Sequence, residues 1–506
     1  MGLPRRTQQP YYLVLMRRLW RSWATIALGL VVIASNAQVI DTVLLTEVGR
    51  YRHPYVSFPD SFSAPTFSSR LDRLGRPYLY MACNDSGLIT LDITDPTLPI
   101  VVDRKYPAVL SGLNVSNLEQ VDDLLYLALG GFSSGTQSAG LAVLDLTNAS
   151  SPAVLGQWNG GATYAQGSAI VKVDDGHAYL GAMEDGIIVL DVSDPANIQF
   201  MSSYQPDPTW PGIAGYPPNG RGMAIVGDVL YLAFDAGALR SIDISDPSSL
   251  TEIGHYLNPS HPILTNPAYN NVVVIGDRAY CTIDYCGLEV VDISDPANMA
   301  QTAWLNPWNC IGLSWFGSDG HTNELITALG DSLLFVSGAD SEILVYDVTD
   351  PDMPLLKGGH ILPNDSASTW GVDVFGDLVV GNFINNHGIP FQPYDSKYGG
   401  VVMFNWQAEF VTGAHEAASA RPSIMTAPNP TSGPLTIQLP SQSRGTTTIS
   451  VMDPLGRTII RSRSDLTTAR DGRAVLDLTP FAPGPYFVTI EEGGRRSTER
   501  VVLVRD

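Results

Sequence analysis

Gly-Ile-Ile-Val-Leu-Asp-Val-Ser-Asp-Pro, residues 186–195, is a ten-residue phrase that the chain repeats. Close copies occupy residues 87–96 and 287–296, and looser copies end at Pro247 and Pro351. Two degenerate copies occupy residues 140–148 and 400–406. A fixed phrase that recurs at this period is typical of a repeat architecture, and here it predicts a β-propeller.

The centre of the phrase is an apolar run that is rich in β-branched residues. Residues 187–190 are apolar on both faces of a strand, so the strand needs cover on both sides. Propeller blades supply that cover because neighbouring sheets pack face to face. We interpret the following Asp191 as a side-chain cap on the turn at Asp194 and Pro195, with a metal ligand as the alternative.

The residues around the phrase predict one four-stranded blade. The expected strands are 168–174, 177–182, 187–193 and 198–204. Asp-Asp-Gly at 174–176 joins the first two as a hairpin turn.

An orphan strand is expected near the N-terminus. Residues 45–51, Leu-Thr-Glu-Val-Gly-Arg-Tyr, nearly repeat residues 250–256, which follow an Asp-Pro turn and should form an outer strand. The blade that ends at Trp406 has no fourth strand after it, so the orphan strand should pair there and close the ring. The sequence thus predicts an all-β fold, a seven-bladed β-propeller closed by its N-terminal strand. Six or eight blades remain alternatives because residues 385–397 form a long insertion.

The repeated phrase resembles the LVIVD repeat of bacterial and archaeal surface proteins. The resemblance covers about residues 70–406. It implies a β-propeller and carries no catalytic residues with it. The phrase aspartate also falls where WD-type propellers place theirs, although no copy has the Trp-Asp pair.

The chain divides into four parts. Residues 1–37 are interpreted as a secretory signal, with a basic region, a short apolar core and small residues before Gln38. The core is too short to span a membrane, and no transmembrane segment is expected in the mature chain. Residues 38–407 are assigned to the propeller, 408–426 to a linker, and 427–506 to a small β-sandwich.

The last part resembles the type A C-terminal sorting domain of the type IX secretion system. Matching positions stand in the family's order: Pro428, Asn429, Pro430, Gly433, Gly456, Arg457, Gly484 and Tyr486. The resemblance implies a Bacteroidota-type source, contact with the type IX machinery, and export to the medium or the outer cell surface.

The charge of the chain excludes one class of partner. The formal net charge is −22, and residues 38–420 hold 43 acidic and 13 basic side chains. A propeller of this charge is not expected to bind nucleic acid. No cofactor is predicted; calcium stays an alternative, although no motif supports it.

Cysteine is sparse, with four residues in the whole chain. Cys281 and Cys286 flank a predicted hairpin turn, so a local disulfide is possible in an exported protein. Cys83 and Cys310 have no evident partner, and no pair has zinc-site spacing. Buried free thiols are the alternative.

The long loops before the first strands should share one face of the disc with the turns between second and third strands. An aromatic and acidic face around a channel is a plausible ligand surface, although the tryptophans could simply pack the loops onto the disc. The candidate residues are Trp210, Tyr216, Trp304, Trp308, Trp315, Trp370, Asp85, Asp185, Asp235, Asp284 and Asp340.

Two functions compete on this sequence, and a purely structural spacer is a third alternative. The first is a non-catalytic surface or secreted protein that binds a glycan, a peptide or another surface protein. The second is an extracellular hydrolase, lactonase-like or glycosidase-like, that uses carboxylates at the channel mouth; it rests on analogy between folds. We favour the binding protein because no nucleophile or metal-ligand motif is present.

Overall fold

The computed structural model describes the chain from Ile40 to Arg505 with gaps. The described ranges are 40–52, 66–130, 137–212, 217–262, 267–284, 286–306, 310, 322–338, 342–361, 368–384, 399–410, 425–427, 431–438, 447–452, 458–462, 473–492 and 495–505. The expected signal at 1–37 lies outside them. In these ranges the regular elements are strands, apart from the short 3-10 turns η1 (Pro107–Val109) and η2 (Gly161–Thr163), and no helix among them is long and apolar enough to cross a membrane.

The array around residues 186–195 has the predicted four strands. It is an antiparallel sheet in chain order, made of β10 (Ile170–Asp174), β11 (His177–Gly181), β12 (Ile187–Asp191) and β13 (Gln199–Tyr204). Alternate residues of β12 enter two different cores: Ile188 and Leu190 pack with the preceding array, and Ile187 and Val189 with the following one. The predicted cover on both faces is confirmed.

Five more arrays repeat this strand order. Their strands are β2 (Ser68–Leu71), β3 (Tyr78–Ala82), β4 (Leu88–Asp92) and β5 (Ile100–Lys105); β6 (Val115–Val121), β7 (Leu124–Leu129), β8 (Gly140–Asp145) and β9 (Ala153–Asn159); β14 (Gly222–Val226), β15 (Val229–Ala233), β16 (Leu239–Asp243) and β17 (Thr251–Tyr256); β18 (Tyr269–Ile275), β19 (Arg278–Ile283), β20 (Gly287–Asp292) and β21 (Ala300–Leu305); and β22 (Leu325–Ala328), β23 (Leu333–Gly338), β24 (Glu342–Asp347) and β25 (Leu355–Ile361).

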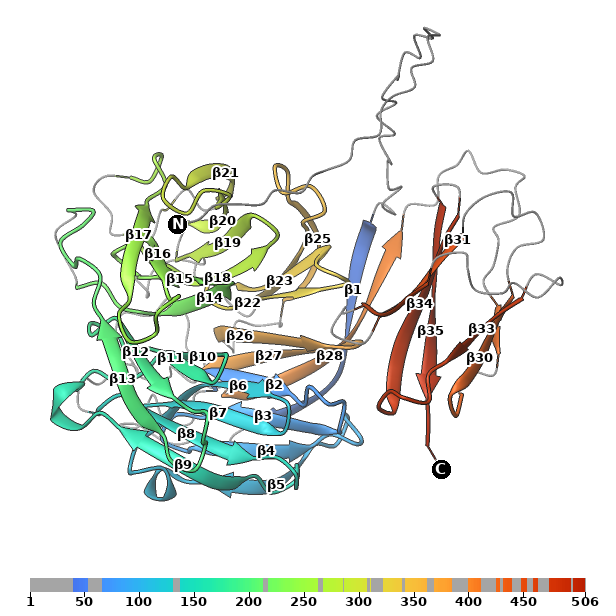
Figure 1. The fold of residues 1–506 in the computed structure, drawn as a ribbon, viewed down its shortest axis with the longest axis horizontal. Helices are drawn as coiled ribbons and strands as arrows, with labels where there is room; N and C mark the ends of the chain where they lie inside the picture. The colour runs from blue at the N-terminus through green and yellow to red at the C-terminus, as the bar shows by residue number, and fades with distance from the viewer. Residues whose placement is uncertain are drawn as a thin grey trace, which may run out of the picture.

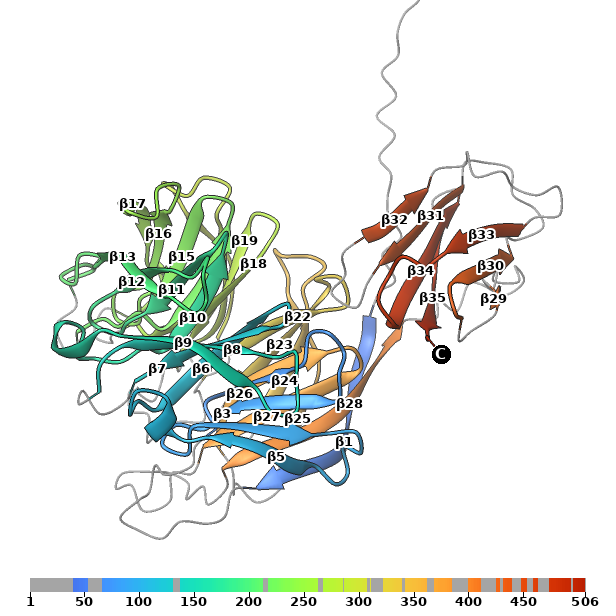
Figure 2. The same ribbon diagram turned by 60° about the horizontal axis from the view of Figure 1, so that its bottom comes forward.

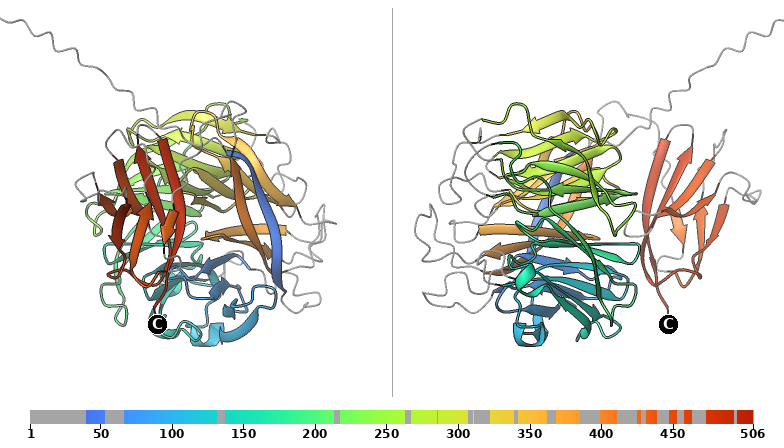
Figure 3. Two further views of the ribbon diagram at one scale, coloured as in Figure 1. Left: turned by 90° about the vertical axis from the view of Figure 1, so that its right-hand side faces the viewer. Right: turned by 60° about the vertical axis from the view of Figure 1, so that its left-hand side comes forward.

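The last array of the ring takes its outer strand from the N-terminus (Figure 2). It consists of β26 (Ser368–Phe375), β27 (Leu378–Ile384), β28 (Gly400–Phe410) and β1 (Ile40–Arg52). Strand β1 runs antiparallel to β28, with Leu45 opposite Trp406 and Tyr51 opposite Val401, so the predicted pairing is confirmed. One parallel bridge, from Val43 to Gly358, also joins β1 to β25. Figure 3 shows β1 in blue beside the orange β28.

The innermost strands close a ring (Figure 1). Going round it, β2, β6, β10, β14, β18, β22 and β26 each contact the next, and β26 contacts β2. The described strands therefore form a β-propeller of four-stranded arrays around a common axis, in which no array has a free inner edge.

The glycine and the aspartate of the repeated phrase are required for two different structural reasons. Gly186 has φ 78°, and a Cβ there would lie 2.5 Å from the carbonyl oxygen of Tyr204, so a side chain is strained and crowded. Asp191 Oδ1 accepts the N–H of Ser193 at 2.9 Å. The equivalent aspartates at 92, 145, 243, 292 and 347 accept the N–H two residues later in the same way. The interpretation as a turn cap is confirmed.

Two further sheets form the C-terminal part of the chain. One is β29 (Met425–Ala427), β30 (Pro434–Gln438) and β33 (Arg473–Asp477); the other is β32 (Thr458–Ser462), β31 (Thr447–Met452), β34 (Gly484–Glu492) and β35 (Arg495–Leu503). Side chains from both sheets fill one apolar core, as in the expected β-sandwich. Of the sorting positions, Gly433, Gly484 and Tyr486 are described, and the Tyr486 hydroxyl donates to Ala482 O at 2.6 Å. Pro428, Asn429, Pro430, Gly456 and Arg457 lie outside the described residues.

Candidate site at the channel mouth

The turns between β3 and β4 and between β15 and β16 contact the residues at which the next innermost strands, β6 and β18, begin. Asn84 N–H donates to Val115 O at 2.9 Å, and Asp235 N–H donates to Tyr269 O at 3.1 Å. The expected shared face is confirmed for these arrays, because each turn is hydrogen-bonded to the segment that enters the next one. This face surrounds the channel mouth.

A small polar pocket opens at this mouth. It holds about 340 Å³ of empty space, including the part that is open to solvent. The lining comes from the first residues of the innermost strands or from those just before them. The lining residues are Phe67, Ser116, Asn117, Ala169, Ile170, Arg221, Asn270, Asn271, Asn323, Glu324 and Trp370.

The amide side chains tie neighbouring arrays together. Asn323 Nδ2 donates to Trp370 O at 2.7 Å, and Asn270 Nδ2 donates to Thr322 O at 2.7 Å. These bonds cross from one innermost strand to the next, so they fix the pocket wall in one arrangement.

Glu324 is the one described carboxylate that lines this pocket. Asn117 Nδ2 donates to its Oε1 and the Val372 N–H donates to its Oε2, each at 3.3 Å. Burial raises the pKa of Glu324 to about 7, although the nearby Arg70 guanidinium opposes that rise. The carboxyl group therefore changes charge close to neutral pH.

Arg70, whose charge acts on Glu324, also belongs to a buried ion cluster around Asp373. Asp373 has a fully buried side chain and forms ion pairs with Arg70, at 2.8 Å, and with Arg73. Its other oxygen accepts the Leu71 N–H at 2.7 Å. All of the Asp373 charge is thus compensated by groups of β2 and the turn that follows it.

The predicted acidic turn residues have different environments. Asp235 lies 4.0 Å from Arg221 Nη1 and accepts Asn219 Nδ2 at 3.1 Å, and burial raises its pKa. Burial also raises the pKa of Asp185. Asp284 is buried and accepts the Thr322 N–H at 3.2 Å. Asp85 lies in the turn between β3 and β4, and Asp340 lies outside the described residues.

The three candidate tryptophans that the structure describes do not gather at one site. Trp370 is buried in the pocket wall, with its ring centroid 5.4 Å from that of Phe67. Trp210 lies against His255 of the outer strand β17, and Trp304 belongs to the outer strand β21. Tyr216, Trp308 and Trp315 lie outside the described residues.

Sequence reasoning missed the polar pocket lining. Asn117, Asn271 and Glu324 stand near equivalent places on β6, β18 and before β22, so these three repeats each contribute one polar side chain. Aligning the innermost strands, rather than the third strands that carry the phrase, would have revealed this row.

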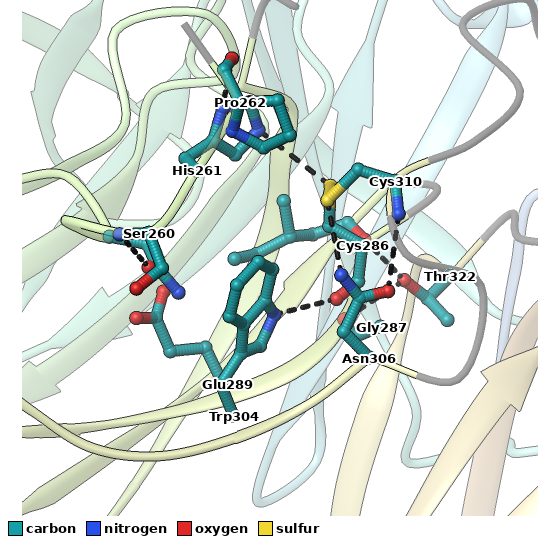
Figure 4. Close-up of a disulfide and its surroundings, with 12 residues drawn as sticks. Ser260, His261, Pro262, Cys286, Gly287, Glu289, Trp304, Asn306, Cys310 and Thr322 are labelled. Carbon is teal, nitrogen blue, oxygen red and sulfur yellow. Dashed lines mark hydrogen bonds between the residues drawn. A yellow bond between two sulfur atoms is a disulfide. The ribbon is translucent and has the colours of Figure 1, made fainter.

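The disulfide prediction is wrong in its pairing. Cys286 is bonded to Cys310, with Cα atoms 4.5 Å apart, and Cys281 is a buried free thiol (Figure 4). The hairpin register explains the difference, because Ile283 pairs with Gly287 and Cys281 therefore lies opposite Glu289. Cys83 is also a buried free thiol.

Comparison with protein families identifies both parts of the chain. The LVIVD repeat family matches residues 77–105, 167–206, 219–257 and 269–303, and the secretion system C-terminal sorting domain family matches residues 426–504. The chain carries LVIVD repeats and a C-terminal sorting domain. The sorting domain indicates export by the type IX secretion system, to the cell surface or the medium, and contact with that machinery.

Solved structures that resemble the chain include propellers of low sequence identity. The WD40 β-propeller domain of Doa1 is 11% identical, with TM-score 0.45, covering 72% of this chain and 97% of that one. The PorZ surface component of the type IX secretion system of Porphyromonas gingivalis is 11% identical, with TM-score 0.40, covering 85% and 64%. None of the curated proteins matches the LVIVD-repeat chain in sequence. The fold assignment therefore rests on the strand pairing.

Proposed function

We propose that this exported LVIVD-repeat protein is a binding protein whose channel mouth accepts a cationic group of a partner, such as a lysine side chain of a peptide or surface protein. The observation that supports this proposal most directly is the position of Glu324, a single carboxyl group in a polar pocket. Acidic turn residues around the mouth and the negative charge of the propeller favour a cation over an anion.

A binding role is better supported than hydrolysis. A glycosidase-type mechanism needs two carboxyl groups that act on one substrate, spaced by roughly 5–10 Å. The acidic neighbour whose charge acts on Glu324 is Asp373, and two arginines neutralise it in a fully buried place. Among the residues that the structure describes, Glu324 therefore has no second uncompensated carboxyl group beside it, which supports recognition of charge rather than acid–base catalysis.

The proposal requires binding to depend on pH. Glu324 must be ionised to attract a cation, and its pKa of about 7 means that the charged form increases as pH rises through neutrality. Affinity for a basic ligand should therefore be higher at pH 8 than at pH 6. A neutral glycan would not show this dependence.

Capture by the full exported chain tests the proposal. The probes are a panel of lysine-containing peptides, their acetyl-lysine counterparts and a glycan array. We expect capture of lysine peptides that Glu324→Gln weakens at least ten-fold. Asp175→Asn is the matched control, because it removes one exposed charge from the β10–β11 hairpin, at the opposite end of the strands.

Three results would count against this function. They are equal capture of acetylated and free lysine peptides, capture that Glu324→Gln leaves unchanged, and capture of glycans alone.

A further inference from the structure

Three potential metal ligands form a buried cluster beside the array β18–β21. They are Cys286 in the turn before β20, Cys310 after β21, and His261 between β17 and β18. One ligand atom from each lies within 4.8 Å of the other two. Figure 4 shows the His261 ring directed toward the two sulfur atoms.

The contacts of the His261 ring direct Nε2 toward the sulfur atoms. Nδ1 lies 3.2 Å from the Pro262 carbonyl oxygen, which can only accept, so Nδ1 carries the hydrogen. Nε2 then keeps its lone pair and lies 3.7 Å from Cys286 Sγ. Metal-bound histidines are commonly oriented in this way, by donating the other ring N–H to a carbonyl oxygen.

The cysteines also have supporting partners. Asn306 Nδ2 donates to Cys310 Sγ at 3.2 Å, and the Cys310 N–H donates to Asn306 Oδ1 at 3.3 Å. A donor of this kind stabilises a thiolate more than a neutral disulfide sulfur, because the acceptor is then charged. Trp304 Nε1 donates to the Cys286 carbonyl at 2.8 Å and fixes the backbone of the second cysteine.

We propose that Cys286, Cys310 and His261 form a redox-gated site for a thiophilic d10 metal ion, specifically Zn²⁺. Two sulfurs and one imidazole nitrogen match the ligand preference of this ion, and its bonds to them are about 2.3 Å and 2.0–2.1 Å long. Tetrahedral bonds of that length place the sulfurs about 3.8 Å apart, which side-chain rotation allows once the disulfide is broken.

Thiol–disulfide exchange at Cys286 and Cys310 controls whether the site can bind the metal ion. An external dithiol gives two electrons and two protons to the Cys286–Cys310 bond, yielding two thiols while the dithiol becomes a cyclic disulfide. Zn²⁺ then displaces both thiol protons and binds the two thiolates and His261 Nε2. A small-molecule disulfide reverses the change: it takes two electrons from the thiolates, leaves as two thiols after gaining two protons, and Zn²⁺ is released.

Metal stoichiometry of the full chain in two redox states tests the proposal. The oxidised chain should bind no Zn²⁺ at this site, and the chain reduced by a dithiol and then desalted should bind one ion tightly. His261→Ala should weaken Zn²⁺ binding at least ten-fold while keeping the disulfide, as shown by thiol titration of the oxidised protein. Co²⁺ in place of Zn²⁺ should give sulfur-to-metal charge-transfer absorption that Cys310→Ser alters.

Cys281→Ser is the matched control, because Cys281 is an equally buried thiol outside the cluster. It should leave the stoichiometry unchanged. The proposal is overturned if the reduced chain binds no ion, if His261→Ala binds as tightly as the wild type, or if Cys281→Ser abolishes binding. If reduction unfolds the chain, Zn²⁺ should restore the circular dichroism of the wild type and not of His261→Ala; failure to restore it contradicts the proposal.

Discussion

Gly49 of β1 lies against the carbonyl oxygen of Pro96, which belongs to the Asp-Pro turn after β4. Gly49 follows a β-bulge in the pairing of β1 with β28. Gly254 holds the same place in β17, where its array meets Pro296 of the next one. The strand that closes the ring therefore repeats a contact made between consecutive arrays.

Gly49→Ala should destabilise the propeller. An added Cβ would overlap the Pro96 carbonyl oxygen, and a backbone atom cannot move aside as the end of a side chain can. Overpacking of this kind costs about 1–3 kcal/mol. Urea unfolding followed by tryptophan fluorescence measures the loss.

Leu44→Ala is the control for that change, because Leu44 is on the same strand with 48% of its surface exposed. It should alter the free energy of unfolding by less than about 0.5 kcal/mol. Gly254→Ala, whose Cβ would lie 2.6 Å from Pro296 O, should resemble Gly49→Ala. A fully stable Gly49→Ala protein would contradict the role assigned to this contact.

The strand that closes the ring could be predicted because a short local sequence pattern marks it as an outer strand. The likeness of residues 45–51 to 250–256 includes Gly49 and Gly254, which have the same packing requirement at the bulge. The capping role of Asp191 was predictable for the same reason, since its acceptor bond spans two residues.

The channel pocket and the disulfide were not predictable in this way. The partner of Cys286 is 24 residues away in the sequence, so the pairing depends on tertiary structure and not on the local hairpin pattern. The charge state of Glu324 depends on burial and on Arg70, far away in sequence. Among the candidate tryptophans, Trp304 belongs to an outer strand whereas Trp370 belongs to an innermost one, a difference that the loop pattern alone does not reveal.

Glu289 should make stability fall as pH rises from about 4.5 to 7. Burial raises its pKa to about 7, although the hydroxyls of Tyr269 and Tyr256 donate to it at 2.6 and 2.7 Å. The folded state therefore holds a proton that the unfolded state releases, and the free energy of unfolding decreases by up to about 1.4 kcal/mol per pH unit. Glu289→Gln should reduce that slope in urea unfolding between pH 5 and 8.

Glu324 has a similarly raised pKa and contributes a slope of the same sign. Glu289→Gln should thus leave part of the dependence, and the double change with Glu324→Gln should remove more of it. An unchanged slope in Glu289→Gln would show that the Glu289 carboxyl is not protonated in the folded state at neutral pH.

Asp373→Asn should be strongly destabilising. The substitution leaves Arg70 and Arg73 without their shared counter-charge in a buried cluster, which typically costs about 3–5 kcal/mol. Asp123→Asn is the comparison, since Asp123 pairs with Arg76 at 2.7 Å but has a side chain 49% exposed. It should cost less than about 1 kcal/mol. Similar losses in the two variants would contradict the buried character of the Asp373 cluster.

Asp243→Asn should be less stable than the wild type at pH 7, and the difference should narrow as the pH is lowered toward 3. The Ser245 hydroxyl and N–H hold the pKa of Asp243 below its usual value. That stabilisation is present above the unfolded pKa of about 4 and is lost as pH falls through the folded pKa. Thermal unfolding at the two pH values measures it. Asp175→Asn, at an exposed hairpin position, should match the wild type at both; a pH-independent deficit in Asp243→Asn would mean that the amide fails as a cap for reasons other than charge.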